Sequence, residues 1–185
     1  IRKRWSFKVS FSPKNIIHFQ LKDLDTSIAI SRIFSKYNIK YYVYTFSTKD
    51  GVIKHGLSAD NEWKRGTWGN RVYKQTLGIP GWNNRPDPTK MDTSAQEMYE
   101  TVCNYFPNIS KDDVIITVYD FTCDLTENNE FHRQTQLMNA ESFLVDMHQE
   151  NYGVLPPGNI KSVQQRPHYH AYTNLFIETE QEHRQ

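Results

Sequence analysis

An α/β (α+β) fold, with a small central antiparallel or mixed β-sheet flanked by helices, is predicted by three features of this 185-residue chain. First, β-branched and aromatic runs over 41–46 and 52–57 predict two neighbouring strands. Second, amphipathic runs over 28–37 and 92–106 predict helices. Third, the apolar run 113–120 predicts a central strand. Because 37% of the residues are hydrophobic, the chain can bury one core of moderate size.

The first forty residues are expected to form an N-terminal extension of two strands and a helix. Alternating apolar and polar residues over 5–11 predict the first strand, and the apolar run 16–21 predicts the second. Asp25 or Thr26 stands where the cap of the following helix should lie. This segment precedes the part of the chain that carries a functional signal.

That signal runs from 41 to 75. An Asp-Gly turn at 50–51 joins the first two strands of this stretch into a hairpin. Pairing the strands brings the Tyr44 hydroxyl near the Lys54 amine if both side chains face the same side of the sheet. Gly56 then lets the backbone bend away.

Cationic and aromatic side chains alternate after the hairpin and on an expected helix over 69–75. Such a mixture suits a sugar-phosphate backbone with exposed bases. For Trp63 and Trp68, burial in the hydrophobic core is an equally good interpretation, since large aromatic side chains are usually buried. We expect nucleic-acid contacts from six residues of this stretch: His55, Ser58, Lys64, Arg65, Tyr73 and Lys74.

Three further elements are expected downstream. Residues 79–92 are rich in glycine and proline and predict an irregular loop. After the 113–120 strand, 121–137 is expected to be a polar connection. Asn139 is then expected to cap a last helix over 140–150, which would place Glu141 in its first turn.

Composition narrows the cellular compartments and the partners that we expect for the protein. The net charge of +1 hides a basic stretch in the first half and an acidic one over 112–150, so a nucleic-acid surface can be local. The two cysteines, Cys103 and Cys123, are too few for a disulfide framework, and neither a signal peptide nor a membrane span is apparent. We therefore expect a cytoplasmic, reduced protein without a membrane partner, located in the host cytoplasm if it is phage-encoded.

Two short motifs and one arginine resemble the GIY-YIG nuclease family. The first motif reads Tyr42-Val43-Tyr44, the second reads Lys54-His55-Gly56-Leu57-Ser58, and Arg71 follows on the expected helix. Tyr42 stands where the family usually has glycine, and Lys54 where it usually has tyrosine. The resemblance is nearest to a branch of GIY-YIG restriction endonucleases that carries this lysine, followed by Gly-x-Ser. In that branch the first-motif tyrosine lies ten positions upstream, as it does here (54 − 44).

The resemblance implies a division of the chain and a set of site residues. A nuclease core spans 41–150, between the extension 1–40 and a C-terminal segment 151–185. The last helix of the family core supplies a metal-binding glutamate, and Glu141 matches that position. The implied catalytic residues, expected to converge on one polar cleft, are Tyr44, Lys54, Arg71 and Glu141, and the implied metal is Mg²⁺ or Mn²⁺ at Glu141.

Phosphodiester hydrolysis needs an activated water, neutralisation of the transition-state charge, and an acid or metal at the leaving oxygen. Lys54 or Tyr44 can activate the water if a nearby cation lowers the pKa of the group concerned. Arg71 can fork onto a phosphate oxygen. Glu141 can hold one divalent ion, with Mg²⁺ preferred by hard oxygen ligands.

These assignments predict a divalent-metal-dependent endonuclease that acts on double-stranded DNA, of either the restriction type or the phage and repair type. We expect a homodimer or higher homo-oligomer, because a two-fold pair is the simplest way for single active sites to cut both strands.

Three alternatives stay open at the level of the sequence. The fold could serve as a nucleic-acid-binding domain without catalysis. Alternatively, His168 and His170 would face one side of a strand and could ligate a transition metal in a different class of enzyme. Within the nuclease interpretation, Arg65 is the main rival of Arg71 for the phosphate-binding role.

Overall fold

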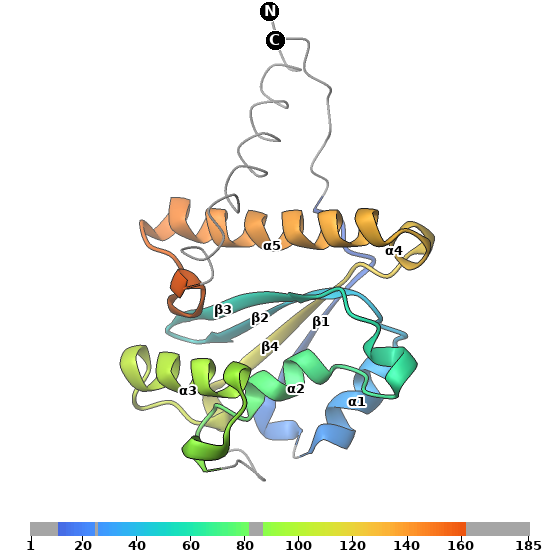
Figure 1. The fold of residues 1–185 in the computed structure, drawn as a ribbon. Coiled ribbons are helices and arrows are strands. Elements are labelled where there is room, and N and C mark those ends of the chain that lie inside the picture. Colours follow the sequence, from blue (N-terminus) through green and yellow to red (C-terminus); the bar gives the residue numbers. More distant parts are fainter. Residues whose placement is uncertain (1–10, 25, 82–86, 162–185) are drawn as a thin grey trace, which may run out of the picture.

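The sheet of this protein lies between two layers of helices (Figure 1). The computed structural model describes residues 11–24, 26–81 and 87–161. In these residues four strands pair in the order β1-β4-β2-β3, and every pairing is antiparallel. The strands are β1 (Asn15–Gln20), β2 (Tyr42–Thr48), β3 (Gly51–Ser58) and β4 (Ile115–Asp120). The predicted α+β class is therefore confirmed.

The predicted hairpin is formed by β2 and β3. Its turn is closed by the backbone N–H of Asp50, which donates to the Thr48 Oγ1 at 3.1 Å. Gly51 follows with a φ of 145°, a conformation that favours glycine. The register pairs Tyr44 with Gly56, and the pairing shifts just beyond Phe46.

The strand β4 lies inside the sheet, as its apolar sequence predicts, because it pairs with β2 on one side and with β1 on the other. The pairing of β1 with β4 extends over six residue pairs. The expected extension is thus built into the same sheet as the hairpin. Residues 5–10 of the other strand expected there lie outside the described residues.

Three helices cover one face of the sheet: α1 (Ser27–Lys36), α2 (Asn70–Thr76) and α3 (Thr93–Tyr105) (Figure 1). Thr26 and Asp92 cap α1 and α3, since their side chains accept hydrogen bonds from Ala29 N and Ala95 N. These helices and their caps agree with the sequence prediction.

The other face is covered by α5 (Glu130–Tyr152), which follows the short helix α4 (Asp124–Asn128) (Figure 1). The predicted polar connection over 121–137 is therefore wrong. Asn129 caps α5 by accepting from His132 N at 2.9 Å, whereas Asn139 is buried in mid-helix. Glu141 accordingly lies in the middle of α5 and not in a first turn.

A physical reason explains this error. The inward side of α5 contains several buried polar residues, so its sequence lacks the apolar stripe by which an amphipathic helix is detected. They are Arg133, Asn139, Glu141 and Ser142. The guanidinium of Arg133, for example, donates to the backbone oxygen of Thr126 at 2.8 Å and lies 4.5 Å from the centre of the Tyr41 ring.

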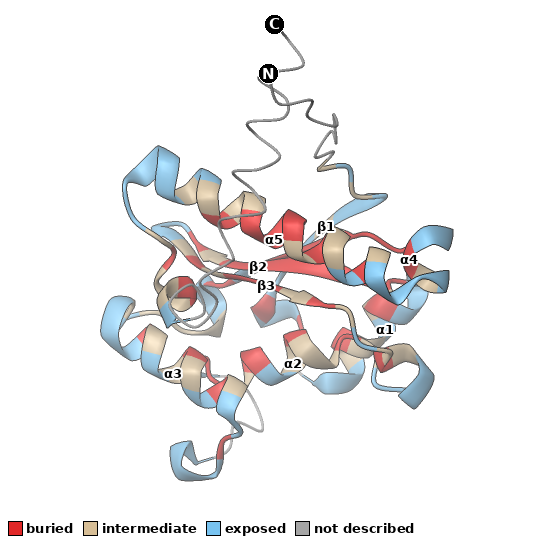
Figure 2. Cartoon of the chain, turned by 45° about the horizontal axis from the view of Figure 1, so that its top comes forward, coloured by how far each residue is buried: buried red, intermediate tan, exposed pale blue. Residues whose placement is uncertain are grey.

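The hydrophobic core has two parts, one on each face of the sheet, and the buried residues in Figure 2 follow the strands and the inner sides of the helices. The larger part lies toward α1, α2 and α3 and includes Phe34, Tyr42, Tyr44 and Phe46. The smaller part lies toward α5 and includes Tyr41 and other residues. Among the described residues, we find no helix with the length and apolar character that a membrane span requires.

Candidate active site

The side chain of Tyr44 lies across Gly56, its partner on the neighbouring strand. A Cβ atom at position 56 would sit 2.3 Å from both the Cζ and the hydroxyl oxygen of Tyr44. Because Tyr44 is only 2% exposed, its ring has little room to move aside. Glycine is thus required here for close packing on the tyrosine, and not only for a bend in the backbone.

Charged groups from separate elements act on the Tyr44 hydroxyl. Burial raises the pKa of Tyr44 well above its ordinary value, so the hydroxyl keeps its proton at neutral pH. The positive charge of Arg71 on α2 lowers this pKa, while the negative charges of Glu141 and Glu62 raise it. The side chain of Gln75 lowers it as well. Charges on α2, on α5 and at Glu62 therefore act on one hydroxyl group of β2.

A buried glutamate outside the predicted set of site residues holds this arrangement together. Glu62 begins the short 3₁₀ helix η2 (Glu62–Arg65) and is 4% exposed. Its Oε1 accepts hydrogen bonds from Ser58 Oγ at 2.7 Å and from the backbone N–H of Arg71 at 3.1 Å, and its Oε2 accepts from the Tyr42 hydroxyl at 3.1 Å. Glu62 thus ties the hairpin to the first turn of α2. No pattern in the sequence around it indicates this role.

The guanidinium of Arg71 reaches the surface beside this network. Its Nη2 lies 3.3 Å from Asp60 Oδ2, and its side chain is 41% exposed. Arg71 borders a small cavity of about 160 Å³ whose other lining residues are Asp60, Glu62, Arg65, Asn70, Lys74 and Ser94. Arg65 and Lys74, two of the expected DNA contacts, therefore lie with Arg71. Such a cluster of cations suits a phosphate group.

Lys54 lies on β3 two residues before Gly56 and pairs with Phe46. The short helix η5 (Pro157–Asn159) packs against it, because a Cβ at Gly158 would sit 2.6 Å from the Lys54 Cβ. Lys54 is half-buried. It thus lies at the edge of the sheet, where β3 meets the segment that follows α5.

Asn159 fixes η5 to that edge. Its Oδ1 accepts from His55 N at 2.8 Å, and its Nδ2 donates to His55 O at 2.8 Å. These two bonds occupy backbone groups that an edge strand otherwise leaves without a strand partner. Asn159 is absent from the predicted site residues, since a residue 104 positions from His55 carries no local signal of the contact.

Two of the residues that we expected to contact DNA have buried side chains. His55 is 5% exposed and its Nδ1 lies 2.7 Å from Thr45 Oγ1; burial, together with the charge of His148, lowers the pKa of His55 to about 3. Ser58 is fully buried and donates to Glu62. His55 and Ser58 are three positions apart and lie on opposite faces of β3, and both side chains are buried because helices cover both faces of the sheet (Figure 1).

The remaining two expected contacts differ from each other. Lys64 is exposed, and its Nζ lies 5.3 Å from the centre of the Trp63 ring. Tyr73 is half-buried and packs on the larger core. Lys64 is thus available to a ligand at the surface, whereas much of the Tyr73 ring serves the core.

The fit of a divalent ion can be tested on the residues around Tyr44. In the described part of the chain, no group of three or more His, Cys, Asp and Glu side chains forms a ready metal centre. Glu141 brings a buried carboxylate to the site, and Gln75 brings a buried Oε1 that has no hydrogen-bond partner within the described residues. Hard oxygens of this kind fit Mg²⁺, which retains several waters and needs few protein ligands.

His168 and His170, the two histidines considered as transition-metal ligands, lie outside the described residues. His132 lies in the first turn of α5, where its backbone N–H is capped by Asn129.

Comparisons of the chain with protein-family models, with curated proteins and with solved structures found no match.

Proposed function

We propose that this protein is a divalent-metal-dependent endonuclease that hydrolyses phosphodiester bonds of double-stranded DNA. The observation that carries the proposal is that the charges of Arg71 and Glu141 both act on the Tyr44 hydroxyl, although the three residues come from β2, α2 and α5. A cation that neutralises charge, a carboxylate that can hold a metal ion and a hydroxyl that can donate a hydrogen bond can each serve phosphodiester hydrolysis near the reacting phosphate.

In this proposal Arg71 binds the reacting phosphate. Its guanidinium already borders a polar cavity and is held at the surface by Asp60. A phosphate oxygen would replace the Asp60 carboxylate as its partner, and a fork of two N–H groups would stabilise the charge that develops in the transition state. The backbone bond from Arg71 to Glu62 keeps the residue in position meanwhile.

Tyr44 and Lys54 share the proton chemistry. Because burial keeps the Tyr44 hydroxyl protonated, its role is to donate a hydrogen bond to the phosphate or to the attacking water. Lys54, two residues along β3 from the glycine that Tyr44 covers, is then the base, and its neutral amine takes the proton of the water. The water oxygen bonds to phosphorus as the bond to the leaving oxygen breaks, and the leaving oxygen takes a proton from solvent.

Glu141 and Gln75 would hold the divalent ion through their buried oxygen atoms. A bound Mg²⁺ supplies a positive charge that stabilises phosphate oxygens during the displacement. The protein's own contribution is to hold the Glu141 oxygens on α5 and the Gln75 oxygen on α2 out of bulk water.

Incubation of the purified full-length chain with plasmid DNA and Mg²⁺ tests the proposal. Cleavage that requires Mg²⁺ and is lost in Glu141→Gln is the expected result, and discrete product ends would add sequence recognition. If the unaltered protein binds DNA but cleaves it with none of the divalent ions tested, the protein is instead a nucleic-acid-binding domain.

We also propose that the active form is a homodimer. Each chain has one site, and two chains related by two-fold symmetry can most simply cut the two strands of a duplex. Light scattering with and without DNA measures this directly. A monomer that still makes double-strand breaks in one encounter would contradict it.

A further inference from the structure

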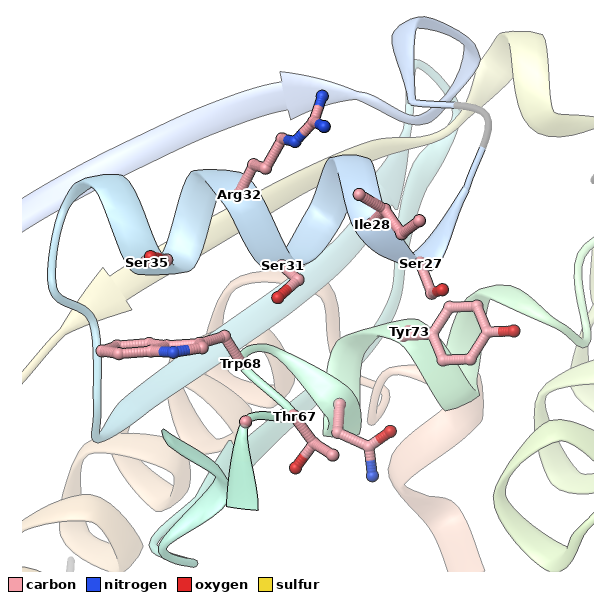
Figure 3. Close-up of a pocket in the computed structure, with 10 residues that line it drawn as sticks. Ser27, Ile28, Ser31, Arg32, Ser35, Thr67, Trp68 and Tyr73 are labelled. Atoms are coloured by element: carbon pink, nitrogen blue, oxygen red, sulfur yellow. The ribbon is translucent and has the colours of Figure 1, made fainter. Parts of the chain in front are cut away.

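A second hollow lies next to the proposed active site, between α1 and the segment that enters α2. It has a volume of about 380 Å³, within the usual range of ligand pockets. Figure 3 shows Ser27 and Ser31 on the side of α1 that faces Thr67 and Tyr73, with Trp68 below the last turn of the helix near Ser35.

The lining of this pocket is polar, aromatic and largely uncharged. Its hydroxyl groups, together with the Asn70 amide, can both donate and accept hydrogen bonds. Trp68 and Tyr73 pack on the larger core yet keep part of their surface in the pocket. Arg32, the one cation among the lining residues, points away from these aromatic rings in Figure 3. A flat, uncharged ring with donors and acceptors on its edge matches this lining.

The two hollows share one wall. Asn70 lines both the pocket under α1 and the cavity that holds Arg71. The cations gather in the smaller cavity, where Arg65 and Lys74 join Arg71, and the aromatic rings gather in the larger pocket. A nucleotide has the same division, since its charged phosphate and its flat, neutral base lie on either side of the sugar.

We propose that the pocket between α1 and Trp68 binds a nucleobase of the substrate strand next to the phosphate held by Arg71. This inference rests on the proposed nuclease function. Bases inside a duplex are stacked and paired, so the pocket accepts a base that is unpaired or turned out of the helix. The protein therefore prefers DNA with an unpaired nucleotide, and Trp68 provides the stacking surface.

The test is a binding measurement with the full-length chain and no divalent ion, so that no strand is cut. Two fluorescent duplexes are compared by anisotropy, one fully paired and one with a single bulged nucleotide. About tenfold tighter binding of the bulged duplex is expected, since this factor equals about 1.4 kcal/mol, which lies within the contribution of stacking one base on an aromatic side chain. Ser31→Leu fills the pocket and removes the preference without weakening binding of the paired duplex. Asn104→Leu, at an exposed position on α3, is the control and keeps the preference.

Two neighbouring tryptophans give a second readout that is independent of affinity. Stacking of a base on Trp68 quenches its fluorescence, so quenching by the bulged duplex is lost in Trp68→Phe. It persists in Trp63→Phe, because the Trp63 ring is covered by Lys40 at 4.3 Å and its Nε1 donates to Tyr41. Equal affinity for both duplexes, or quenching that survives Trp68→Phe, overturns the proposal.

Two other outcomes separate the base pocket from the nuclease function. If plasmid cleavage fails but the preference and its loss in Ser31→Leu remain, the nuclease function falls and the base pocket stands. If dAMP binds in a manner sensitive to Ser31→Leu while neither duplex is preferred, the pocket serves a free nucleotide. That last result overturns the assignment to the substrate strand.

Discussion

The backbone N–H of Arg71 donates a 3.1 Å hydrogen bond to the buried carboxylate of Glu62. The same carboxylate accepts from Ser58 on β3 and from Tyr42 on β2. Burial raises the pKa of Glu62, and the hydrogen bonds that it accepts lower that pKa. One side chain thus sets the position of the proposed phosphate-binding residue relative to the strand that contains Tyr44.

The substitution Glu62→Gln should therefore weaken both stability and cleavage. An amide in place of the carboxylate brings an N–H₂ group against at least one of the three donors and leaves it unsatisfied. The expected loss is about 1–3 kcal/mol in the free energy of unfolding, measured with urea. Cleavage should fall further than DNA binding, because Arg71 stays present but is less well placed. Glu97→Gln, which removes one partner of an exposed pair with Lys161, is the matched control and should be near neutral.

A second prediction concerns the contact between Tyr44 and Gly56. Gly56→Ala should destabilise the protein by about 1–3 kcal/mol or more, because the added methyl group overlaps a buried ring. The cost should largely vanish in a Tyr44→Ala background, and a double-mutant cycle measures the difference. If Gly56→Ala costs the same in both backgrounds, the ring contact is not the reason for the glycine.

The third prediction is a pH dependence due to His55. Burial lowers its pKa from about 6.5 to about 3 in the folded protein, so between these values the unfolded chain binds the proton more readily. Stability from this group is full above pH 6.5 and is lost as the pH falls toward 3. Between pH 7 and pH 5 the loss is about 2 kcal/mol. The difference in unfolding free energy between pH 7 and pH 5 should thus be smaller in His55→Gln than in the unaltered protein. An equal loss of stability in both proteins would contradict the assignment.

The fourth prediction separates Arg71 from Arg65, which share a cavity. Arg71→Ala should weaken DNA binding and cut cleavage by orders of magnitude, because its charge alone of the two acts on the Tyr44 hydroxyl. Arg65→Ala should reduce binding modestly and lower its salt dependence by about one phosphate contact. Cleavage assays and binding titrations over a salt series measure both effects. A larger loss of cleavage in Arg65→Ala would exchange the two roles.

The sequence predicts those parts of the fold that local physics determines. The hairpin follows from its strand composition and its Asp-Gly turn, and α3 follows from Asp92 and an apolar stripe. The helix α5 escapes prediction because polar residues such as Arg133 and Asn139 occupy its buried side. Long-range contacts fix their burial, and no short window of sequence contains them.

The residues of the candidate site also fall into two groups, those that the sequence indicates and those that it does not. The motifs around Tyr44 and Gly56, with Arg71 on the next helix, indicate a candidate site through their resemblance to a nuclease family, and the sequence contains them because the hairpin and the next helix are local elements. Glu62 and Asn159 have no such signal, since each acts by hydrogen bonds to backbone or side chains on other elements. Burial of His55 and Ser58 depends on helices packed on both faces of β3, which the local alternation pattern does not reveal.

The last prediction separates metal binding from DNA binding at Glu141. Glu141→Gln keeps the volume of the side chain but removes the charge that a hard cation requires, so cleavage in Mg²⁺ should fall by orders of magnitude. DNA binding should survive or tighten, because a negative charge beside a phosphate is removed. Glu141 is buried within α5, so thermal unfolding must show that the variant remains folded.

The matched control for this prediction is Glu100→Gln. Glu100 is an exposed glutamate on α3, and its loss should leave cleavage unchanged. Near-normal cleavage by Glu141→Gln in Mg²⁺ would refute the metal assignment. A fall in cleavage in Glu97→Gln or Glu100→Gln would then move the metal ion to α3, where both residues lie. The charge of Glu141 acts on the Tyr44 hydroxyl, and this is the physical reason to place the ion at α5.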